Sequence, residues 1–407
     1  MGSTLELLED ILVYGILLCI FIFAYHKLVS PLFSTQTEGF SAQTDILPAQ
    51  TRITADIATA RQKSPTFFTQ TSSAPFLPPN QSFLVNICPL TGYIGGYLGP
   101  PEKLMNAEYY IQTAIRAGIR SFVLPITTYV NKSKTPPNWP MSGNPVLACR
   151  DSSGIIISEN GISLDNFISA LIQYKSVSGY GSDPIFLTLQ DDTEAIDMKF
   201  VGYVNFMKKI ARALSPLDPY RLTTVASYGS VVGGTSQKEL LTQIPLSAFQ
   251  NKIVIFTNFD TSQDADQTLA SYANFIYSND ATLPVRTIAL ENLVGTTVDY
   301  VTNARIHWYI SQTNTPFVNN TLVAPSTTSV QLALDNGLQC IPIPFLSTPM
   351  ADITDIWNLW KGASYRLKAE AARYTQPDPI LPAKVSTKLN ARPSNAPGQE
   401  PGTLSVP

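Results

Sequence analysis

The stretch Asn106–Thr127, which reads NAEYYIQTAIRAGIRSFVLPIT, carries the pattern that decides the fold. Its first part, Asn106–Ala117, predicts a helix. Its last part, Ser121–Thr127, is an apolar run of the length that buried strands have. A helix followed at once by a buried strand is typical of the repeating unit of a parallel α/β sheet.

The same alternation extends to both sides of this stretch. Further strands are predicted at Phe83–Cys88, Pro145–Cys149, Ile185–Leu189, Leu222–Tyr228, Lys252–Asn258 and Gln339–Pro344. Further helices are predicted at Leu164–Tyr174, Phe200–Ala213, Asp266–Tyr277 and Ile353–Trp360. Strands joined by helical crossovers over a segment of this size predict an α/β fold of the (β/α)8 TIM-barrel-like class.

Composition excludes several classes of protein. Hydrophobic residues make up 44% of the 407 residues, which is enough for a large core and excludes a wholly disordered chain. The chain has 27 Lys and Arg against 30 Asp and Glu, so we expect no nucleic-acid partner. With four cysteines and two histidines, little remains for a zinc site, and a pocket with two histidines would need both His26 and His307.

The N-terminal segment Leu7–Val29 has an unbroken apolar run, Ile11–Tyr25, at its centre. At about 1.5 Å per residue it is long enough for the roughly 30 Å hydrocarbon core of a bilayer. A signal peptide would begin with basic residues and end with small ones, whereas Glu9 and Asp10 precede this run and Tyr25 lies near its end. The alternative is a buried hydrophobic helix, but a lone terminal segment has no partner to bury it. We therefore expect residues 1–33 to form a single-pass transmembrane anchor.

Three further parts follow the anchor. Residues 34–80 are rich in Ser, Thr and Gln and predict a stalk, residues 81–374 hold the barrel, and residues 375–407 form a proline-rich tail. Lys27 and Arg52 follow the apolar run and no Lys or Arg precedes it, which favours a cytoplasm-facing barrel. Core positions for Cys88, Cys149 and Cys340 suit free thiols and agree with that orientation. Three glycosylation sequons, at Asn80, Asn131 and Asn319, point the other way.

Several segments, in their order along the chain, resemble a known family. They are Pro89–Tyr93, Tyr109–Arg120, Pro145–Leu147 with Ser163–Leu171, Pro184–Leu189, Asn251–Ile255, Asn336–Ile343 and Ser364–Lys368. Together they resemble the X and Y halves of the catalytic barrel of phosphoinositide-specific phospholipase C, across residues 83–374. The resemblance implies a TIM barrel.

The functional positions of that family are substituted here. Its chemistry uses two histidines, and a calcium ion held by Asn, Glu, Asp and Glu. Carried over one by one, these positions fall on Leu90 (first histidine), Thr91 (calcium asparagine), Val123 and Pro125 (glutamate and aspartate), Asp151 or else Cys149 (second histidine), and Gln190 (last glutamate). Leucine cannot move a proton, and a proline side chain cannot bind calcium. The resemblance therefore implies a barrel without catalytic activity, with no cofactor and no metal.

Two other groups of residues have functional and structural interpretations. Asp191, Asp192 and Glu194 follow a predicted strand at the end where barrel enzymes keep catalytic groups. With Asp151 they could form a metal site or an acid–base pair, or they could be a solvated loop that caps the next helix. His307-Trp308-Tyr309 is better interpreted as a core or interface cluster than as a ligand group.

These observations favour a membrane-anchored structural protein that binds other proteins of an assembly, in the manner of a virion component of a large DNA virus. That setting rests on analogy with the general organisation of such proteins and not on a sequence motif. The alternative is a module that binds phosphoinositide headgroups, which would need basic residues where the chain has Phe256, Thr257 and Asn258. A third hypothesis is a hydrolase that uses Asp151, Asp191, Asp192 and Glu194.

Overall fold

The computed structural model describes residues 77–377. Segments within that span are excepted, namely 95–106, 129–142, 149–155, 157–160, 178–181, 194–197, 200, 226–228, 231–235, 264–265, 267, 291–302, 313–316, 319–320, 323, 345–349 and 362. The predicted anchor (1–33), nearly all of the stalk (34–80) and the tail from residue 378 lie outside the described residues. Among the residues that are described, no helix is long and apolar enough to span a bilayer.

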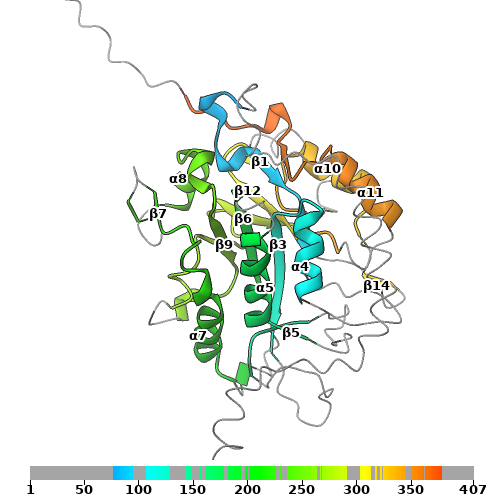
Figure 1. Ribbon diagram of the computed structural model, residues 1–407. Helices are drawn as coiled ribbons and strands as arrows, with labels where there is room; N and C mark the ends of the chain where they lie inside the picture. Colours follow the sequence, from blue (N-terminus) through cyan, green and yellow to red (C-terminus); the bar gives the residue numbers. More distant parts are fainter. Residues whose placement is uncertain are drawn as a thin grey trace, which may run out of the picture.

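Five parallel strands form the centre of the molecule (Figure 1). In spatial order they are β2 (Thr91–Tyr93), β3 (Ser121–Thr127), β6 (Ile185–Asp191), β9 (Ile253–Thr257) and β10 (Phe275–Ile276). Every residue of β3 is buried, as expected for a strand covered on both faces. The predicted parallel α/β sheet is confirmed.

Two further parallel strands continue this arrangement. They are β11 (Val285–Ile288) and β12 (Trp308–Ser311), which pair with each other. Single parallel bridges then join Ser278 to Arg286, Ile310 to Cys340, and Gly92 to Ile343. Within the described residues, no continuous ladder closes the sheet into a barrel.

The two faces of the sheet bury different side chains because successive residues of a strand point to opposite sides. Phe122 and Leu124 of β3 face the surrounding helices. Phe186 and Phe256 belong to a second cluster on the other face, where Trp308 lies with its ring centroid 5.5 Å from that of Phe256 and 5.7 Å from that of Phe186. Aromatic rings therefore fill the inner side of the sheet.

Helices cover the outer side. They are α4 (Ala107–Arg116), α5 (Leu164–Val177), α7 (Tyr203–Leu214), α10 (Thr327–Asp335) and α11 (Met350–Leu359). The short helix α8 (Gln237–Thr242) packs instead against the inner cluster, through Leu240 and Leu241. In α7, the buried residues Phe206, Met207 and Ile210 recur at helical spacing and form the face that packs on the sheet. Four predicted helices (106–117, 164–174, 200–213 and 353–360) are confirmed within a few residues.

The shorter elements complete the chain. The short strands are β1 (Ile87–Pro89), β4 (Val146–Leu147), β5 (Ile162–Ser163), β7 (Thr224–Val225), β8 (Gly229–Ser230), β13 (Phe317–Val318), β14 (Thr321–Leu322) and β15 (Tyr365–Leu367). The 3-10 turns are η3 (Pro79–Gln81), η4 (Leu84–Asn86), η5 (Ser215–Leu217), η6 (Leu246–Phe249), η7 (Thr261–Gln263) and η9 (Glu370–Ala372).

Four predicted strands differ from the parallel strands that we expected. Of the segment Gln339–Pro344, only Cys340 and Ile343 form single parallel bridges. The segment 83–88 forms η4 and then β1, which pairs antiparallel with β15. Asn86 explains the turn, because its side chain donates to the carbonyls of Gln81 and Tyr374. The segment 145–149 gives β4, which is antiparallel to both β3 and β5. The described part of the segment 222–228 gives β7, which is antiparallel to β8.

The predicted helix Asp266–Tyr277 is wrong. Residues 268–272 form turns, and β10 follows them. Asn274 holds this segment extended, because its backbone N–H donates to the carbonyl of Ile255, its side-chain oxygen accepts from the Ile255 N–H, and its side-chain amide donates to the carbonyl of Leu222. Pairing with β9 satisfies the backbone groups that a helix would have satisfied internally.

A fully buried ion pair joins the amino ends of the two central strands. Arg120 precedes β3 and Asp183 precedes β6, and their side chains are 1% and 0% exposed. The Arg120 Nε donates to Asp183 Oδ2 at 2.8 Å, and Nη1 donates to the carbonyls of Ile115 and Ile119 at the end of α4. The pair therefore fixes a helix and two strands to one another.

Removing one partner of this pair is expected to destabilise the fold strongly. Asp183→Ala should lower the free energy of unfolding by about 3–5 kcal/mol, because it leaves the Arg120 guanidinium buried without its counter-ion. Urea unfolding monitored by circular dichroism measures the change. The matched control is Lys208→Ala, which breaks the exposed Lys208–Asp266 pair and should alter stability little. Equal effects of the two substitutions would contradict the prediction.

Candidate functional site

The carboxyl ends of the parallel strands are the first place to look for a site, because barrel enzymes keep their catalytic groups there. In Figure 1 these ends lie toward the lower part of the molecule, near β5. Thr127 ends β3, Asp191 ends β6, and Thr257 ends β9. The register pairs Ile126 with Asp191 and Leu189 with Thr257, so the three ends are neighbours.

Leu90 and Thr91 lie at the opposite end of the sheet. The carbonyl of Leu90 accepts from the amides of Arg120 and Ser121, and Thr91 pairs with Ser121, the first residue of β3. Both residues are buried. The structure therefore does not bring Leu90 and Thr91 together with Gln190, and the residue that follows β2 at its carboxyl end is the buried Ile94.

Of the remaining predicted positions, one lies in the core, two lie near the ends of strands, and the others lie outside the described residues. Val123 lies in the aromatic-rich inner cluster. Pro125 pairs with Gln190 across the β3–β6 register, so these two residues are adjacent. Asp151, the alternative Cys149 and Glu194 lie outside the described residues.

Asp191 is the best-defined carboxylate at the carboxyl ends. Its Oδ1 accepts from the backbone N–H of Thr193 at 3.1 Å and from the Thr193 hydroxyl at 2.6 Å. Its Oδ2 accepts from the Tyr203 hydroxyl at 2.9 Å. The Tyr203 oxygen in turn accepts from the Asp260 N–H at 2.9 Å, and the Asp191 N–H donates to Asn258 Oδ1 at 2.6 Å. Asp191 thereby connects β6, the start of α7 and the loop after β9.

This geometry favours a structural role for Asp191. Both of its oxygens accept hydrogen bonds from neutral groups, those of Thr193 in the following loop and of Tyr203 at the start of α7. This agrees with the interpretation of the sequence pattern as a loop that precedes a helix. Burial and, after it, the charge of Asp191 raise the pKa of Tyr203 above its usual value, so the tyrosine remains a donor. Among the described residues, no three His, Cys, Asp or Glu side chains are grouped so that they could hold a metal ion.

His307 lies immediately before β12, at the amino end of that strand. Its Nδ1 is 2.7 Å from the carbonyl oxygen of Asn303, and its Nε2 is 2.8 Å from a guanidinium nitrogen of Arg286. Burial lowers the pKa of His307 from its usual 6.5. The next two residues, Trp308 and Tyr309, are buried in the core, so the core interpretation of this cluster is correct.

Sequence reasoning did not identify Lys368 as a buried cation. Its side chain is 1% exposed, and its Nζ donates to the carbonyl oxygens of Ala304 and His307. Burial lowers the pKa of Lys368 to about 7. The nearby Cys88 is a free buried thiol whose pKa is raised by burial to about 12. The predicted free thiols are confirmed for Cys88 and Cys340, and Cys149 is outside the described residues.

Similarity to known proteins is seen in structure and not in sequence. No protein-family model matches the chain, and no curated protein matches it in sequence. The structure is similar to L. pealei PLC21, with a TM-score of 0.50 and 12% identity, over 73% of this chain and 38% of that one. S. officinalis PLC21 gives a TM-score of 0.48 and 13% identity over the same shares. A calcium-dependent phosphoinositol-specific phospholipase C from Pseudomonas sp. gives 0.42 and 9%, over 72% of this chain and 97% of that one.

The likeness to L. pealei PLC21 shows the fold: the chain has a phospholipase C-like α/β architecture. The matched part spans 38% of the length of that protein. At this level of identity the likeness concerns the fold alone.

The Asp191–Tyr203 contact should behave as a stabilising pair. Tyr203→Phe is expected to lower the free energy of unfolding by about 1 kcal/mol, because Asp191 Oδ2 and the Asp260 N–H each lose a partner. A double-mutant cycle with Asp191→Asn, measured by urea unfolding, should give a coupling energy of about 1 kcal/mol. Additive effects of the two substitutions would show that the contact does not stabilise the fold.

Lys368 should make stability depend on pH. Its pKa is about 7 in the folded protein against 10.5 ordinarily, so the unfolded chain binds more protons between these values and stability should rise with pH. The relevant window is pH 7 to 9, where burial also lowers the pKa of Lys175 to about 8 and so adds a smaller rise in the same direction. Above pH 9 the raised pKa values of Cys88 and Cys340 act in the opposite direction. We expect Lys368 to contribute a rise of about 2 kcal/mol in this window, measured by urea unfolding.

The variant Lys368→Met should remove this contribution and leave the smaller rise that Lys175 causes. The control Lys252→Met removes a partly exposed lysine that precedes β9 and should keep it. A slope that is unchanged in Lys368→Met would contradict the prediction and assign the pH dependence to other groups.

Proposed function

We propose that this chain is a phospholipase C-like barrel without catalytic activity, which acts as a membrane-anchored structural protein and binds other proteins of an assembly. The position of His307 is the observation that carries the proposal. The chain has two histidines. His26 lies in the apolar N-terminal segment, and the imidazole of His307 is engaged by Asn303 and Arg286 at the amino end of the sheet. His307 therefore does not supply a general base at the carboxyl ends.

The carboxyl ends themselves support the same proposal. The chemistry expected from the resemblance needs a base and a set of carboxylates around calcium. Here Pro125 and Gln190 lie side by side where two neighbouring strands end, and the Asp191 carboxylate is engaged by Thr193 and Tyr203. This supports a loss of catalysis, and disfavours a hydrolase built on Asp191.

We also propose that the parallel strands form a closed (β/α)8-type barrel. The bridge between Ser278 and Arg286 leads from β10 to β11, and the bridge between Ile310 and Cys340 leads from β12 to the segment 340–343. The bridge between Gly92 and Ile343 returns to β2. Hydrogen bonds support this last link, because Ile343 donates to Thr91 and accepts from Tyr93.

The proposed membrane anchor and the proposed binding to other proteins are supported by the amino-acid sequence. The apolar run Leu7–Val29 would serve as the single-pass anchor, and the barrel would face the cytoplasm. The stalk and the proline-rich tail would contact other components, for which a virion membrane is the setting we favour. A headgroup-binding module is the alternative, and the test below separates the two.

The full chain, purified in detergent and reconstituted in vesicles, tests the proposal. We expect no calcium-dependent hydrolysis of phosphatidylinositol above the rate of empty vesicles, with the Pseudomonas phospholipase C as positive control. Calcium-dependent turnover would overturn the proposal. Tighter binding to phosphoinositide vesicles than to plain ones would favour the alternative if it persists in the variant Arg373→Gln, whose residue lies away from the carboxyl ends of the strands. The reconstituted chain should also resist alkaline extraction, and its release would refute the anchor.

A further inference from the structure

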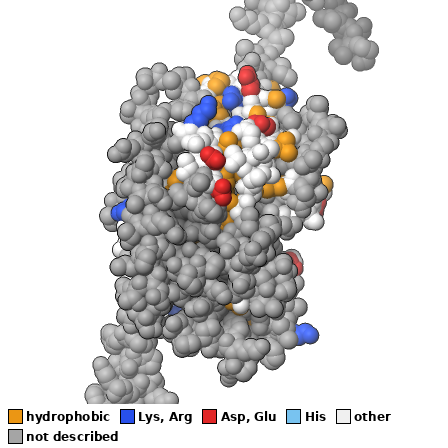
Figure 2. All heavy atoms as spheres, turned by 90° about the vertical axis from the view of Figure 1, so that its right-hand side faces the viewer, with side chains coloured by type: hydrophobic (Ala, Val, Ile, Leu, Met, Phe, Trp, Pro, Cys, Tyr) orange, Lys and Arg blue, Asp and Glu red, His pale blue; other side chains and the backbone are white. Residues whose placement is uncertain are grey.

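A groove of about 650 Å³ lies between α10, the end of α11, and β15 with the turn that follows it. Its volume is in the range of small-molecule sites. Figure 2 views the side of the molecule that carries α10 and α11, and Lys and Arg side chains gather near the top of that face. The groove is remote from the carboxyl ends of the strands, because β15 pairs with β1 at the amino end of the sheet.

The lining of this groove is basic. It includes Lys361, Arg366 and Arg373, and no carboxylate lines it. Lys368 lines it too, but its ammonium group is held by the carbonyls of Ala304 and His307. Three cations are therefore available on the wall of a single concave surface.

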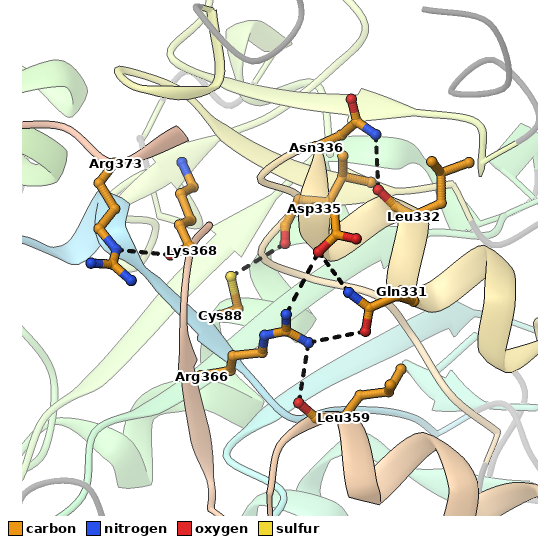
Figure 3. A network of polar contacts seen from close by, with 10 residues as sticks. Cys88, Gln331, Leu332, Asp335, Asn336, Leu359, Arg366, Lys368 and Arg373 are labelled. Carbon is orange, nitrogen blue, oxygen red and sulfur yellow. Dashed lines mark hydrogen bonds and ion pairs between the residues drawn. The ribbon is translucent and has the colours of Figure 1, made fainter. Parts of the chain in front are cut away.

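Arg366 is held in place by its neighbours (Figure 3). Its Nη1 donates to the carbonyl of Leu359 at 3.1 Å, and Nη2 is 3.7 Å from Asp335 Oδ1. Asp335 also accepts from Gln331 at 2.6 Å. The guanidinium is thus oriented by α10 and α11 while 26% of the side chain stays exposed. The long distance to Asp335 leaves its charge partly uncompensated.

Arg373 is oriented in a similar way. Its Nε donates to the carbonyl of Lys368 at 2.8 Å, which fixes the plane of the guanidinium (Figure 3). Within the described part of the chain, its two Nη groups have no partner. Two parallel N–H donors on a fixed guanidinium match the oxygens of a phosphate.

Lys361 has an unfavourable backbone conformation. It follows α11 with φ of 54°, in the left-handed region that favours glycine or asparagine at a helix end. A lysine there is strained by about 1 kcal/mol relative to glycine. Such strain at the edge of a groove is a reason to look for a function of the side chain.

We propose that this groove binds a phosphate group carried by a small molecule or by a lipid headgroup. Three cations and the adjacent Asp335 leave about two positive charges, which match the charge of −1.5 to −2 on a phosphate monoester at neutral pH. A ligand with one carboxylate group would neutralise only one of the two net positive charges of the groove. None of the residues that line the groove is among those named at the carboxyl ends of the strands. Loss of binding at the groove would therefore leave the proposed loss of catalysis unaffected.

Titration calorimetry with the full chain in detergent tests the groove, with inorganic pyrophosphate as the soluble probe. We expect saturable binding that Arg373→Gln weakens at least about tenfold, as for the loss of one charge-assisted hydrogen bond. The matched control is Arg212→Gln on the exposed surface of α7, which should leave the affinity unchanged. Equal weakening by both variants would show nonspecific charge attraction and overturn the site.

A second variant distinguishes a loss of binding from a loss of folding. Lys361→Gly removes a cation and relieves the left-handed strain, so it should raise the melting temperature of the free protein and weaken pyrophosphate binding several-fold. A purely structural Lys361 would raise the melting temperature without changing the affinity, which would exclude it from the site.

A flotation experiment with vesicles distinguishes a lipid headgroup from a soluble phosphate ligand. Phosphatidylcholine vesicles with and without phosphatidylinositol phosphate are floated with the chain and with Arg373→Gln. Arg373-dependent flotation without pyrophosphate binding assigns a lipid headgroup, and pyrophosphate binding without flotation assigns a soluble ligand. Absence of both would refute the proposal.

Discussion

The buried pair of Arg120 and Asp183 is the contact on which the sheet depends. An ion pair that is shut off from water is stabilising only if the remaining polar groups also find partners. Here the guanidinium donates to the carbonyls that end α4 as well as to the carboxylate, so the start of β3, the start of β6 and the end of one helix meet at one charge. Asp183 Oδ1 accepts no hydrogen bond within the described residues, so the requirement is met only in part. The register of the two strands that make the longest ladder follows from this anchor point.

The interior of the sheet is closed by aromatic packing. Phe186, Phe256 and Trp308 occupy the inner face, and Tyr365 of β15 adds its ring and donates to the carbonyl of Pro184. Rings of this size bury much apolar area with few rotatable bonds. The result is a rigid scaffold whose polar groups are used in its own loops, as Asp191 shows, and such a scaffold suits a protein that presents surfaces to partners.

Both ends of the described chain leave from the amino end of the sheet. Gln376 donates to the carbonyl of Asn80, and Gln81 donates to Thr375, so the two ends are tied together there (Figure 1). The basic groove lies at the same end, near β15. A partner or a membrane that engages the chain ends would therefore approach the groove, and would leave the carboxyl ends of the strands pointing away.

The sequence by itself determined the parallel α/β class, the main helices and most of the central strands, because a fully buried strand or an amphipathic helix is specified by its own residues. It also limited the chemistry, since two histidines are all that the chain has. It could not reveal β10, where the side chain of Asn274 holds the segment extended against β9, nor β11, whose strand character depends on pairing with β12. Nor could it place Leu90 at the amino end of the sheet, because that depends on which residues of its segment pair with β3. Only the tertiary structure gathered Lys361, Arg366 and Arg373 around one groove, since packing between distant segments brings their charges together.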